Sequence, residues 1–262
     1  RKLVDFCVEK LQDSFALLVS PASSTPGKDS DDKGGRRMFN RSSKALKQHS
    51  DSSSPHRAAI HGSGVLLSML VREFPKLAGG LPRALIKKVL AVSEIMVSCQ
   101  SNEALATSGS ANVCIRAGFC ILSGVLSTGP GGVDSHMPLI VELWQNTVKA
   151  AKQGGKAIPQ EDVLDCLGAA LTSVVSFLKY CSELLLSIPE ALYQLTMLLE
   201  EVFPLLLPGG PFGSLSTSAA GGARLENATA SLLEAFAWLP SGSFPMIADD
   251  VFNLATSRIE KA

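Results

Sequence analysis

Apolar residues recur along most of the chain at the spacing of an amphipathic helix. Within 138–150, apolar residues at helical intervals fall on one face, and these are Leu139, Ile140, Leu143, Trp144 and Val148. The alternation of apolar and polar residues that marks a half-exposed strand is absent from the sequence. The pattern therefore predicts an all-α protein.

Four prolines each stand directly before an apolar helical run, and they are Pro82, Pro138, Pro189 and Pro245. The intervals are 56 residues from 82 to 138, 51 from 138 to 189 and 56 from 189 to 245. Proline suits the first position of a helix, because its missing N–H would have no partner there and its fixed φ is already helical. We predict that each of these prolines begins a helix.

Each proline-initiated run follows a short turn, and another apolar helical run precedes that turn. The unit of helix, turn and helix occurs four times, at 57–103, 111–153, 160–208 and 222–262. Residues 1–19 have the same character and are predicted to be the last helix of a preceding repeat. Helix pairs that recur at roughly 40–50 residues are typical of α-solenoids of the HEAT or armadillo kind.

The predicted fold is therefore a half-repeat followed by four antiparallel helical hairpins in a right-handed superhelical stack. The sequence begins at Arg1 and opens directly on a helical pattern, so we expect the chain to be a fragment of a longer solenoid. Stacking of neighbouring repeats would bury the apolar residues that make up 46% of the chain.

Gly129 and Pro130 open a glycine-rich stretch that invites comparison with phosphate-binding loops. Such a loop needs a preceding strand and a G-x-x-x-x-G-K-[ST] pattern, and the sequence has neither. The stretch also occupies the same place between two helices as 75–81 and 240–244. We predict a turn.

Residues 20–56 break the helical pattern, because they are rich in Ser, Gly and charged residues and poor in large apolar ones. Such a composition predicts a disordered, solvated loop. A phosphoregulated docking loop is the alternative: Ser42 and Ser43 follow a basic residue, Ser54 precedes a proline, and added phosphate would invert the local charge.

Charge and cysteine content exclude some classes of function. The chain has 24 basic and 24 acidic residues, so no global field favours nucleic acid. The most apolar stretch, 184–207, is interrupted by prolines and glutamates, which argues against a membrane span. The six cysteines contain no CxxC pair and are expected to be reduced, as in an intracellular protein: Cys7, Cys99, Cys114, Cys120, Cys166 and Cys181.

No pattern in the sequence indicates an active site, a cofactor or a metal. The four histidines are scattered and none has metal-ligand spacing. Asp134, Ser135 and His136 are adjacent in sequence, but a catalytic triad is assembled in space from distant segments. Asp134 or Ser135 is better interpreted as an acceptor for free N–H groups at the start of the next helix. We expect a protein that is not an enzyme.

Short motifs in the second and third units resemble the HEAT-repeat-containing protein 5 family. They are Ala117-Gly118, Gly129-Pro130, His136-Met137-Pro138 and Leu143-Trp144-Gln145-Asn146, followed by Cys181, Glu183, Leu184 and Leu185. The resemblance covers roughly 57–206. It implies a non-catalytic scaffold of membrane traffic that associates with the clathrin adaptor of the trans-Golgi network and endosomes.

The expected function is thus a protein-interaction scaffold, with clathrin-adaptor or coat components as the partners that the resemblance implies. Nucleic acid is not an expected partner. Membrane association would be peripheral and would occur through partners, which places the protein in the cytoplasm and at Golgi or endosome membranes. The alternative is a HEAT or armadillo scaffold of another type, a nuclear transport receptor or a phosphatase or kinase regulatory subunit.

Overall fold

The computed structural model describes residues 2–19, 42–73, 82–99, 110–153, 160–212, 220–240 and 243–259, with side chains from 55 onward in the second range. These residues form helices and turns and contain no strand, so the all-α prediction is confirmed for the described part of the chain.

The elements follow one another in a simple order. The helices are α1 (Lys2–Val19), α2 (Ser42–Glu73), α3 (Arg83–Ser98), α5 (Ser110–Leu126), α6 (Met137–Gln153), α7 (Gln160–Tyr180), α8 (Glu183–Ser187), α9 (Pro189–Leu206), α10 (Ala220–Ala237) and α11 (Ala248–Ile259). Short 3₁₀ turns at Pro130–Gly132, Asp134–His136 and Pro245–Ile247 lie in the connections before α6 and α11.

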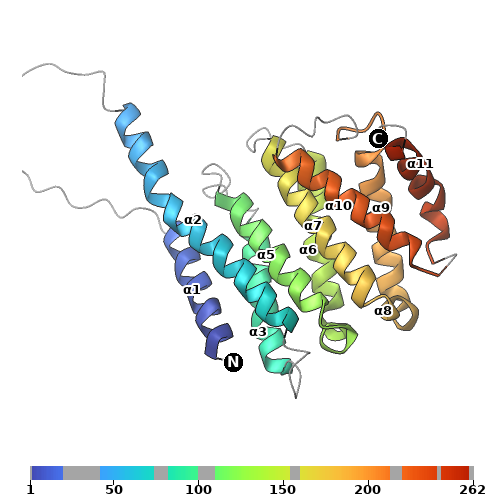
Figure 1. Cartoon of the computed structure of the whole chain (residues 1–262), viewed down its shortest axis with the longest axis horizontal. Coiled ribbons are helices and arrows are strands. Elements are labelled where there is room, and N and C mark those ends of the chain that lie inside the picture. Colours follow the sequence, from blue (N-terminus) through green and yellow to red (C-terminus); the bar gives the residue numbers. More distant parts are fainter. Residues whose placement is uncertain are drawn as a thin grey trace, which may run out of the picture.

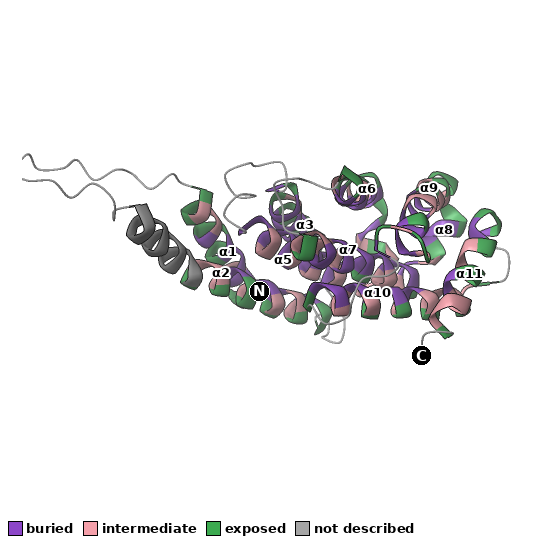
Figure 2. Cartoon of the chain, turned by 90° about the horizontal axis from the view of Figure 1, so that it is seen from above, coloured by how far each residue is buried: buried purple, intermediate pink, exposed green. Residues whose placement is uncertain are grey.

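The helices lie in two layers (Figures 1 and 2). Helices α2, α5, α7 and α10 lie side by side in the front layer, and contacts join α2 to α5, α5 to α7 and α7 to α10 in chain order. Helices α3, α6 and α9 form the second layer, and the buried residues lie mainly between the two layers. The arrangement is compatible with an α-solenoid.

Glycines inside the helices allow the front layer to pack closely. A Cβ added at Gly124 of α5 would lie 2.7 Å from the carbonyl oxygen of Ser68 in α2. A Cβ at Gly168 of α7 would lie 3.1 Å from the backbone nitrogen of Leu225 in α10. Larger side chains at these positions would push the helix axes apart, since the separation depends on the residues at the contact.

The repeat pattern does not specify which front-layer helix each of α1, α3 and α6 contacts. Close backbone contacts join α1 to α2, α3 to α5 and α6 to α7, so α1, α3 and α6 each lie against the first helix of the following predicted hairpin. Helix α6 also contacts α9. At Gly118 of α5, an added Cβ would lie 2.7 Å from Val97 of α3. Ser93 of α3 donates a buried hydrogen bond of 2.8 Å to the Gly118 carbonyl oxygen.

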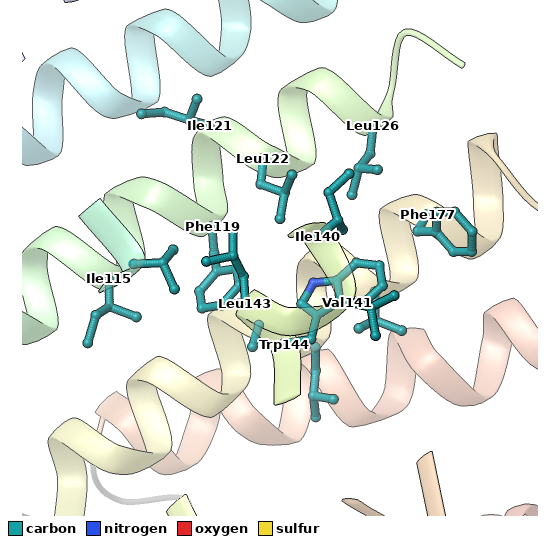
Figure 3. Close-up of a cluster of buried hydrophobic side chains, with 14 of the residues drawn as sticks. Ile115, Phe119, Ile121, Leu122, Leu126, Ile140, Val141, Leu143, Trp144 and Phe177 are labelled. Atoms are coloured by element: carbon teal, nitrogen blue, oxygen red, sulfur yellow. The ribbon is translucent and has the colours of Figure 1, made fainter. Parts of the chain in front are cut away.

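Large side chains separate α5 from α6 and fill the space between the layers (Figure 3). Trp144 of α6 is fully buried, and its ring meets Phe177 of α7 edge-on with centroids 5.7 Å apart. Its indole N–H donates to the Ser173 hydroxyl at 2.6 Å, and that hydroxyl donates to the Ala170 carbonyl oxygen at 2.7 Å. The indole and hydroxyl donors in this core are therefore both satisfied.

The predicted prolines stand at or next to helix starts. Pro189 is the first residue of α9, Pro138 is the second residue of α6, and Pro82 directly precedes α3. Pro245 begins the 3₁₀ turn that leads into α11. Proline has no backbone N–H, and a residue in the first turn of a helix or just before it needs none, because no intrahelical acceptor is available there.

The glycine-rich stretch is a turn between α5 and α6, as predicted. Gly129 has a φ of +92°, a left-handed conformation that favours glycine, and Pro130 begins the 3₁₀ turn that follows. Asp134 accepts a 2.7 Å hydrogen bond from the backbone N–H of Ser135. It therefore satisfies a donor in the 3₁₀ turn before α6, and not one within α6 as predicted.

Two connections differ from the sequence prediction. Helix α2 begins at Ser42, so the predicted loop over 20–56 was wrong for 42–56, while 20–41 lies outside the described residues. Polar residues extend a helix at little cost once an adjoining segment has nucleated it, and composition alone does not detect this. The connection before Pro189, predicted as a short turn, contains the short helix α8 (Glu183–Ser187).

The candidate phosphorylation sites Ser42, Ser43 and Ser54 all lie in α2. Their side chains lie outside the described residues, so their modification stays a prediction.

Among the described residues, α7 is long and apolar enough to cross a membrane. Its apolar window is 61% buried, and α7 contacts α5, α6 and α10. The composition of α7 is thus explained by its place in the middle of the fold.

Replacing Gly124 with alanine should destabilise the protein, because the new methyl group would collide with the backbone of α2. We expect Gly124→Ala to lower the free energy of unfolding by about 1–3 kcal/mol in urea titrations. Gly62 is an exposed helical glycine with nothing within 4 Å of an added Cβ. Gly62→Ala should instead stabilise by roughly 0.5–1 kcal/mol, and a harmless Gly124→Ala would contradict the close packing.

Loss of the buried indole should also be costly. We expect Trp144→Ala to lower the free energy of unfolding by about 3–5 kcal/mol, because it leaves a cavity between α6 and α7. Trp238, whose side chain is 82% exposed, supplies the matched control. Trp238→Ala should change stability by less than about 0.5 kcal/mol, and equal effects of the two substitutions would refute the assigned burial.

Candidate functional site

A groove of about 770 Å³ runs across the front layer and is the candidate functional site. We call it the four-helix groove, because α2, α5, α7 and α10 all contribute to its lining. The lining residues are His61, Ser68, Arg72, Arg116, Phe119, Cys120, Ser123, Gly124, Ser127, Ala169, Thr172, Val175, Ser176, Lys179, Tyr180, Arg224 and Ser231. They include three arginines, one lysine and many hydroxyl groups, and no carboxylate.

Helical periodicity explains why these residues share one surface. Arg116 and Cys120 of α5 and Ser127, which directly follows α5, recur at intervals of four and seven residues, which places them along one stripe. Residues at similar intervals in α2, α7 and α10 form the neighbouring stripes. Because contacts such as Gly124 on Ser68 hold the helices close together, the four stripes form one continuous surface.

One end of the groove holds two arginines around a shared carboxylate. Arg116 and Arg224 each place a guanidinium nitrogen 3.1 Å from a different oxygen of Asp165. Burial lowers the pKa of the Arg116 guanidinium, and Asp165 opposes that shift. Asp162 also acts on Arg116, so the two arginines of this end, which we call the paired-arginine cluster, are opposed by two carboxylates.

The other end holds Arg72, Lys179 and Tyr180. An Arg72 guanidinium nitrogen donates to the Tyr180 hydroxyl at 3.4 Å, and the Lys179 ammonium lies 5.8 Å from the centroid of the Tyr180 ring. Within the described residues, neither cation forms an ion pair with a carboxylate. This tyrosine cluster therefore carries two positive charges that no described carboxylate neutralises.

Hydroxyl groups occupy the floor between the two clusters. Ser127 donates to the Gly124 carbonyl oxygen of α5 at 2.6 Å, and Thr172 donates to the Gly168 carbonyl oxygen of α7 at 2.8 Å. Each hydroxyl keeps lone pairs that can accept a further bond. The buried hydroxyl of Ser123 has no hydrogen-bond partner among the described residues. The groove thus offers unneutralised positive charge at the tyrosine cluster and neutral polar groups between the two ends.

Cys120 also lines the groove, but its environment does not activate it. Burial raises the pKa of the Cys120 thiol, and the Ser68 hydroxyl and Arg116 only partly oppose this shift. A thiol becomes a good nucleophile when its pKa is lowered, so Cys120 is suited to packing.

The remaining cysteines are free thiols in the described structure. Burial raises the pKa of both Cys166 and Cys181 to about 12, with Asp162 beside the first and Glu183 beside the second adding to the shift. Cys99 and Cys114 share a hydrogen bond that raises the pKa of Cys99 and lowers that of Cys114. Cys114 is fully buried, so its thiol is not presented to a substrate.

The structure does not bring the sequence-predicted residues together into a site. Pro82, Pro138, Pro189 and Pro245 serve as helix starts, and Trp144 lies in the core. The described residues hold no group of three or more His, Cys, Asp or Glu side chains placed to bind a metal.

Hydrophobic periodicity identifies the apolar stripe of each helix and does not identify the groove residues. Arg116, Ser123 and Ser127 form a polar stripe of helical period along α5 and just beyond its end, but the sequence does not show which helices lie beside that stripe. Comparison with known proteins adds nothing to this geometry, since neither a protein-family model nor a solved structure matches the chain.

Stability should fall at alkaline pH because of the buried thiols. The folded protein holds the protons of Cys166 and Cys181 to about pH 12, whereas the unfolded chain releases them near the ordinary value of 9.0. Deprotonation therefore favours the unfolded chain between pH 9 and pH 12. Below pH 9, the protonated thiols contribute their full stabilisation. The loss is at most about 1.4 kcal/mol per pH unit for each thiol.

Urea titrations between pH 8 and pH 11 test this sign. The double variant Cys166→Ala, Cys181→Ala should lose stability more slowly above pH 9 than the wild type. Parallel curves for the two proteins would contradict the raised pKa of these thiols.

Proposed function

We propose that the chain is a protein-interaction scaffold built as an α-solenoid of HEAT or armadillo type. Four helix pairs would stack as repeats in a right-handed superhelix, and α1 would complete a preceding repeat. The chain-order contacts of α2, α5, α7 and α10 support this proposal, because in a solenoid each repeat contacts its neighbours.

Exposed apolar side chains at both ends of the stack also support it. Phe6 of α1 is 59% exposed at one end, and Trp238 and Phe252 are 82% and 71% exposed at the other. Faces of this kind are what a further repeat would cover in a longer solenoid.

The four-helix groove is the observation that carries the interaction role. It spans four helices that are distant in sequence, and it combines unneutralised cations with hydroxyl groups that can bond to a partner. A surface assembled from several stacked helices suits an elongated protein ligand. The raised pKa of the Cys120 thiol supports a binding role over nucleophilic catalysis.

The resemblance of the second and third units to the HEAT-repeat-containing protein 5 family gives the proposal its cellular setting. The scaffold would associate with a clathrin adaptor or coat component and would reach Golgi and endosome membranes through that partner. Gly118, Gly129 and Trp144, which belong to the resembling motifs, have structural roles here, so the resemblance bears on the fold more directly than on the groove.

Proximity labelling tests the proposed function. The chain fused to a biotin ligase should enrich clathrin-adaptor subunits and their accessory proteins when it is expressed in cells. Enrichment of nuclear pore components or of a phosphatase or kinase would leave an interaction scaffold but overturn the trafficking role. No enrichment of any protein over the free ligase would overturn the scaffold itself.

A matched pair of variants assigns the binding surface in the same experiment. Arg72 and Lys179 are exposed in the groove, whereas Lys87 and Lys149 are exposed on the second layer. The groove variant, Arg72→Glu with Lys179→Glu, should lose the partners. The second-layer variant, Lys87→Glu with Lys149→Glu, makes the same change in net charge and should keep them.

A further inference from the structure

Two cysteine side chains meet where α3 lies against α5. Cys99 directly follows α3, and Cys114 lies in the second turn of α5. The Cys99 thiol donates a 3.7 Å hydrogen bond to the carbonyl oxygen of Ala111, which stands three residues before Cys114. Cys99 also shares a hydrogen bond with the Cys114 thiol. The two sulfur atoms are therefore direct neighbours, although both cysteines are free thiols.

The close approach of α3 and α5 holds this pair in place. An added Cβ at Gly118 would lie 2.7 Å from Val97, and Ser93 donates to the Gly118 carbonyl oxygen at 2.8 Å. Six residues further along the chain from Ser93, Cys99 meets Cys114 of α5, so the two helices run in opposite directions. A disulfide requires Cα atoms about 4.4–6.8 Å apart, and such close helix axes favour that separation.

The other cysteines of the described structure have different neighbours. The hydrogen bond with Cys114 is the main cause of the raised pKa of Cys99, and Cys166 adds less to it. The Cys166 thiol donates instead to the side-chain oxygen of Asn112 at 3.6 Å. None of the groups that act on the remaining thiols is a sulfur, and those thiols are Cys7, Cys120 and Cys181. Cys99 and Cys114 are thus the pair that is placed to form a disulfide.

The shared hydrogen bond also makes one sulfur more reactive than the other. It lowers the pKa of Cys114, burial opposes that shift, and the nearby charge of Arg57 adds to it. Arg57 of α2 reaches the start of α5, where its Nε donates to the Ser110 hydroxyl at 3.1 Å. Since the thiolate is the form that attacks an oxidant, Cys114 should react first. Cys99, whose pKa is raised, is then the thiol that completes the disulfide.

Burial restricts the oxidant to a small molecule. Cys114 has no exposed surface, and Cys99 is 5% exposed, so neither sulfur is open to a protein or to a bulky disulfide. Cys99 directly follows the last turn of α3, and helix ends open locally at a lower free energy than the core. A neutral hydroperoxide is small enough to enter through such an opening.

We propose that Cys99 and Cys114 form a reversible dithiol site for hydrogen peroxide, which closes to a disulfide between α3 and α5. The Cys114 sulfur attacks one peroxide oxygen and the O–O bond breaks. The hydroxide that leaves takes up the proton that the Cys114 thiol released. The Cys99 sulfur then attacks the Cys114 sulfenic acid, the S–O bond breaks, and water leaves with the Cys99 proton. Two thiols are thus oxidised to one disulfide while one peroxide is reduced to two waters.

The disulfide would join the second layer to the front layer between the first two predicted hairpins. Its two ends are 15 positions apart in the chain, so it restricts the unfolded chain by closing a loop. Oxidation should therefore raise the melting temperature by about 5–10 °C, and a small dithiol should reverse the change by thiol–disulfide exchange. The inference does not depend on the proposed interaction role.

Mass spectrometry of the peroxide-treated chain tests the inference. The intact chain is treated with hydrogen peroxide, remaining thiols are alkylated with iodoacetamide, and the peptides are analysed without reductant. A linked pair of peptides that contain Cys99 and Cys114 should appear, and dithiothreitol should remove it. The Cys166→Ala variant is the matched control, because it removes a neighbouring sulfur and should form the same linked pair.

Two further variants separate the roles of the two sulfurs, and alanine avoids placing a hydroxyl in the core. Cys99→Ala should leave Cys114 as a sulfenic acid, so labelling by dimedone should rise at least about fivefold over the wild type. Cys114→Ala should abolish the linked pair and give no dimedone adduct at Cys99. Equal labelling of the two variants would overturn the assigned order of reaction.

The wild-type chain alone also decides the question, so the test does not depend on the folding of a variant. The inference is wrong if peroxide oxidises the half-buried Cys120 while Cys99 and Cys114 remain free thiols. It is also wrong if the linked pair forms only after the chain is unfolded in urea. A fall in the melting temperature at full linkage would show that the bridge distorts the packing, and would likewise overturn it.

Discussion

The close approach of helix backbones in the front layer is the constraint on which the rest of the structure depends. Gly124 brings α5 against the carbonyl oxygen of Ser68, and Gly168 brings α7 against the backbone of Leu225. Gly118 does the same between α5 and α3. An added Cβ would collide at Gly124 and Gly118 and would be crowded at Gly168, so a wider residue would separate the axes and change the surface that the helices share.

The groove is a consequence of this packing. Close axes bring polar stripes of four helices into one surface, whereas bulky residues such as Trp144 and Phe177 hold the second layer at a distance and fill the interior. Arg116 and Arg224 meet at Asp165 only because α5, α7 and α10 are adjacent. The chemistry of the surface and the stability of the core thus depend on the same small residues.

The sequence predicted the elements of this fold better than their arrangement. Proline at the start of a helix and apolar residues at helical spacing are local signals, and α3, α6, α7 and α9 lie where they indicated. The start of α2 at Ser42 was missed, because a polar segment joined to an apolar helix has no apolar period of its own. Helical glycines were a visible signal of close contacts, but their partners depend on which helices become neighbours. The groove could not be predicted for the same reason.

Zero-length carbodiimide coupling, read by mass spectrometry of the monomer, tests the layered arrangement most directly. The reagent joins a lysine to a carboxylate only where the two form a contact. We expect coupling of Lys88 to Asp5, which are 2.7 Å apart and join α3 to α1. We also expect coupling of Lys152 to Glu201, which are 3.1 Å apart and join α6 to α9. Coupling of Lys88 to Glu201 instead, or of either lysine to the acidic residues of α11, would contradict the order of the helices.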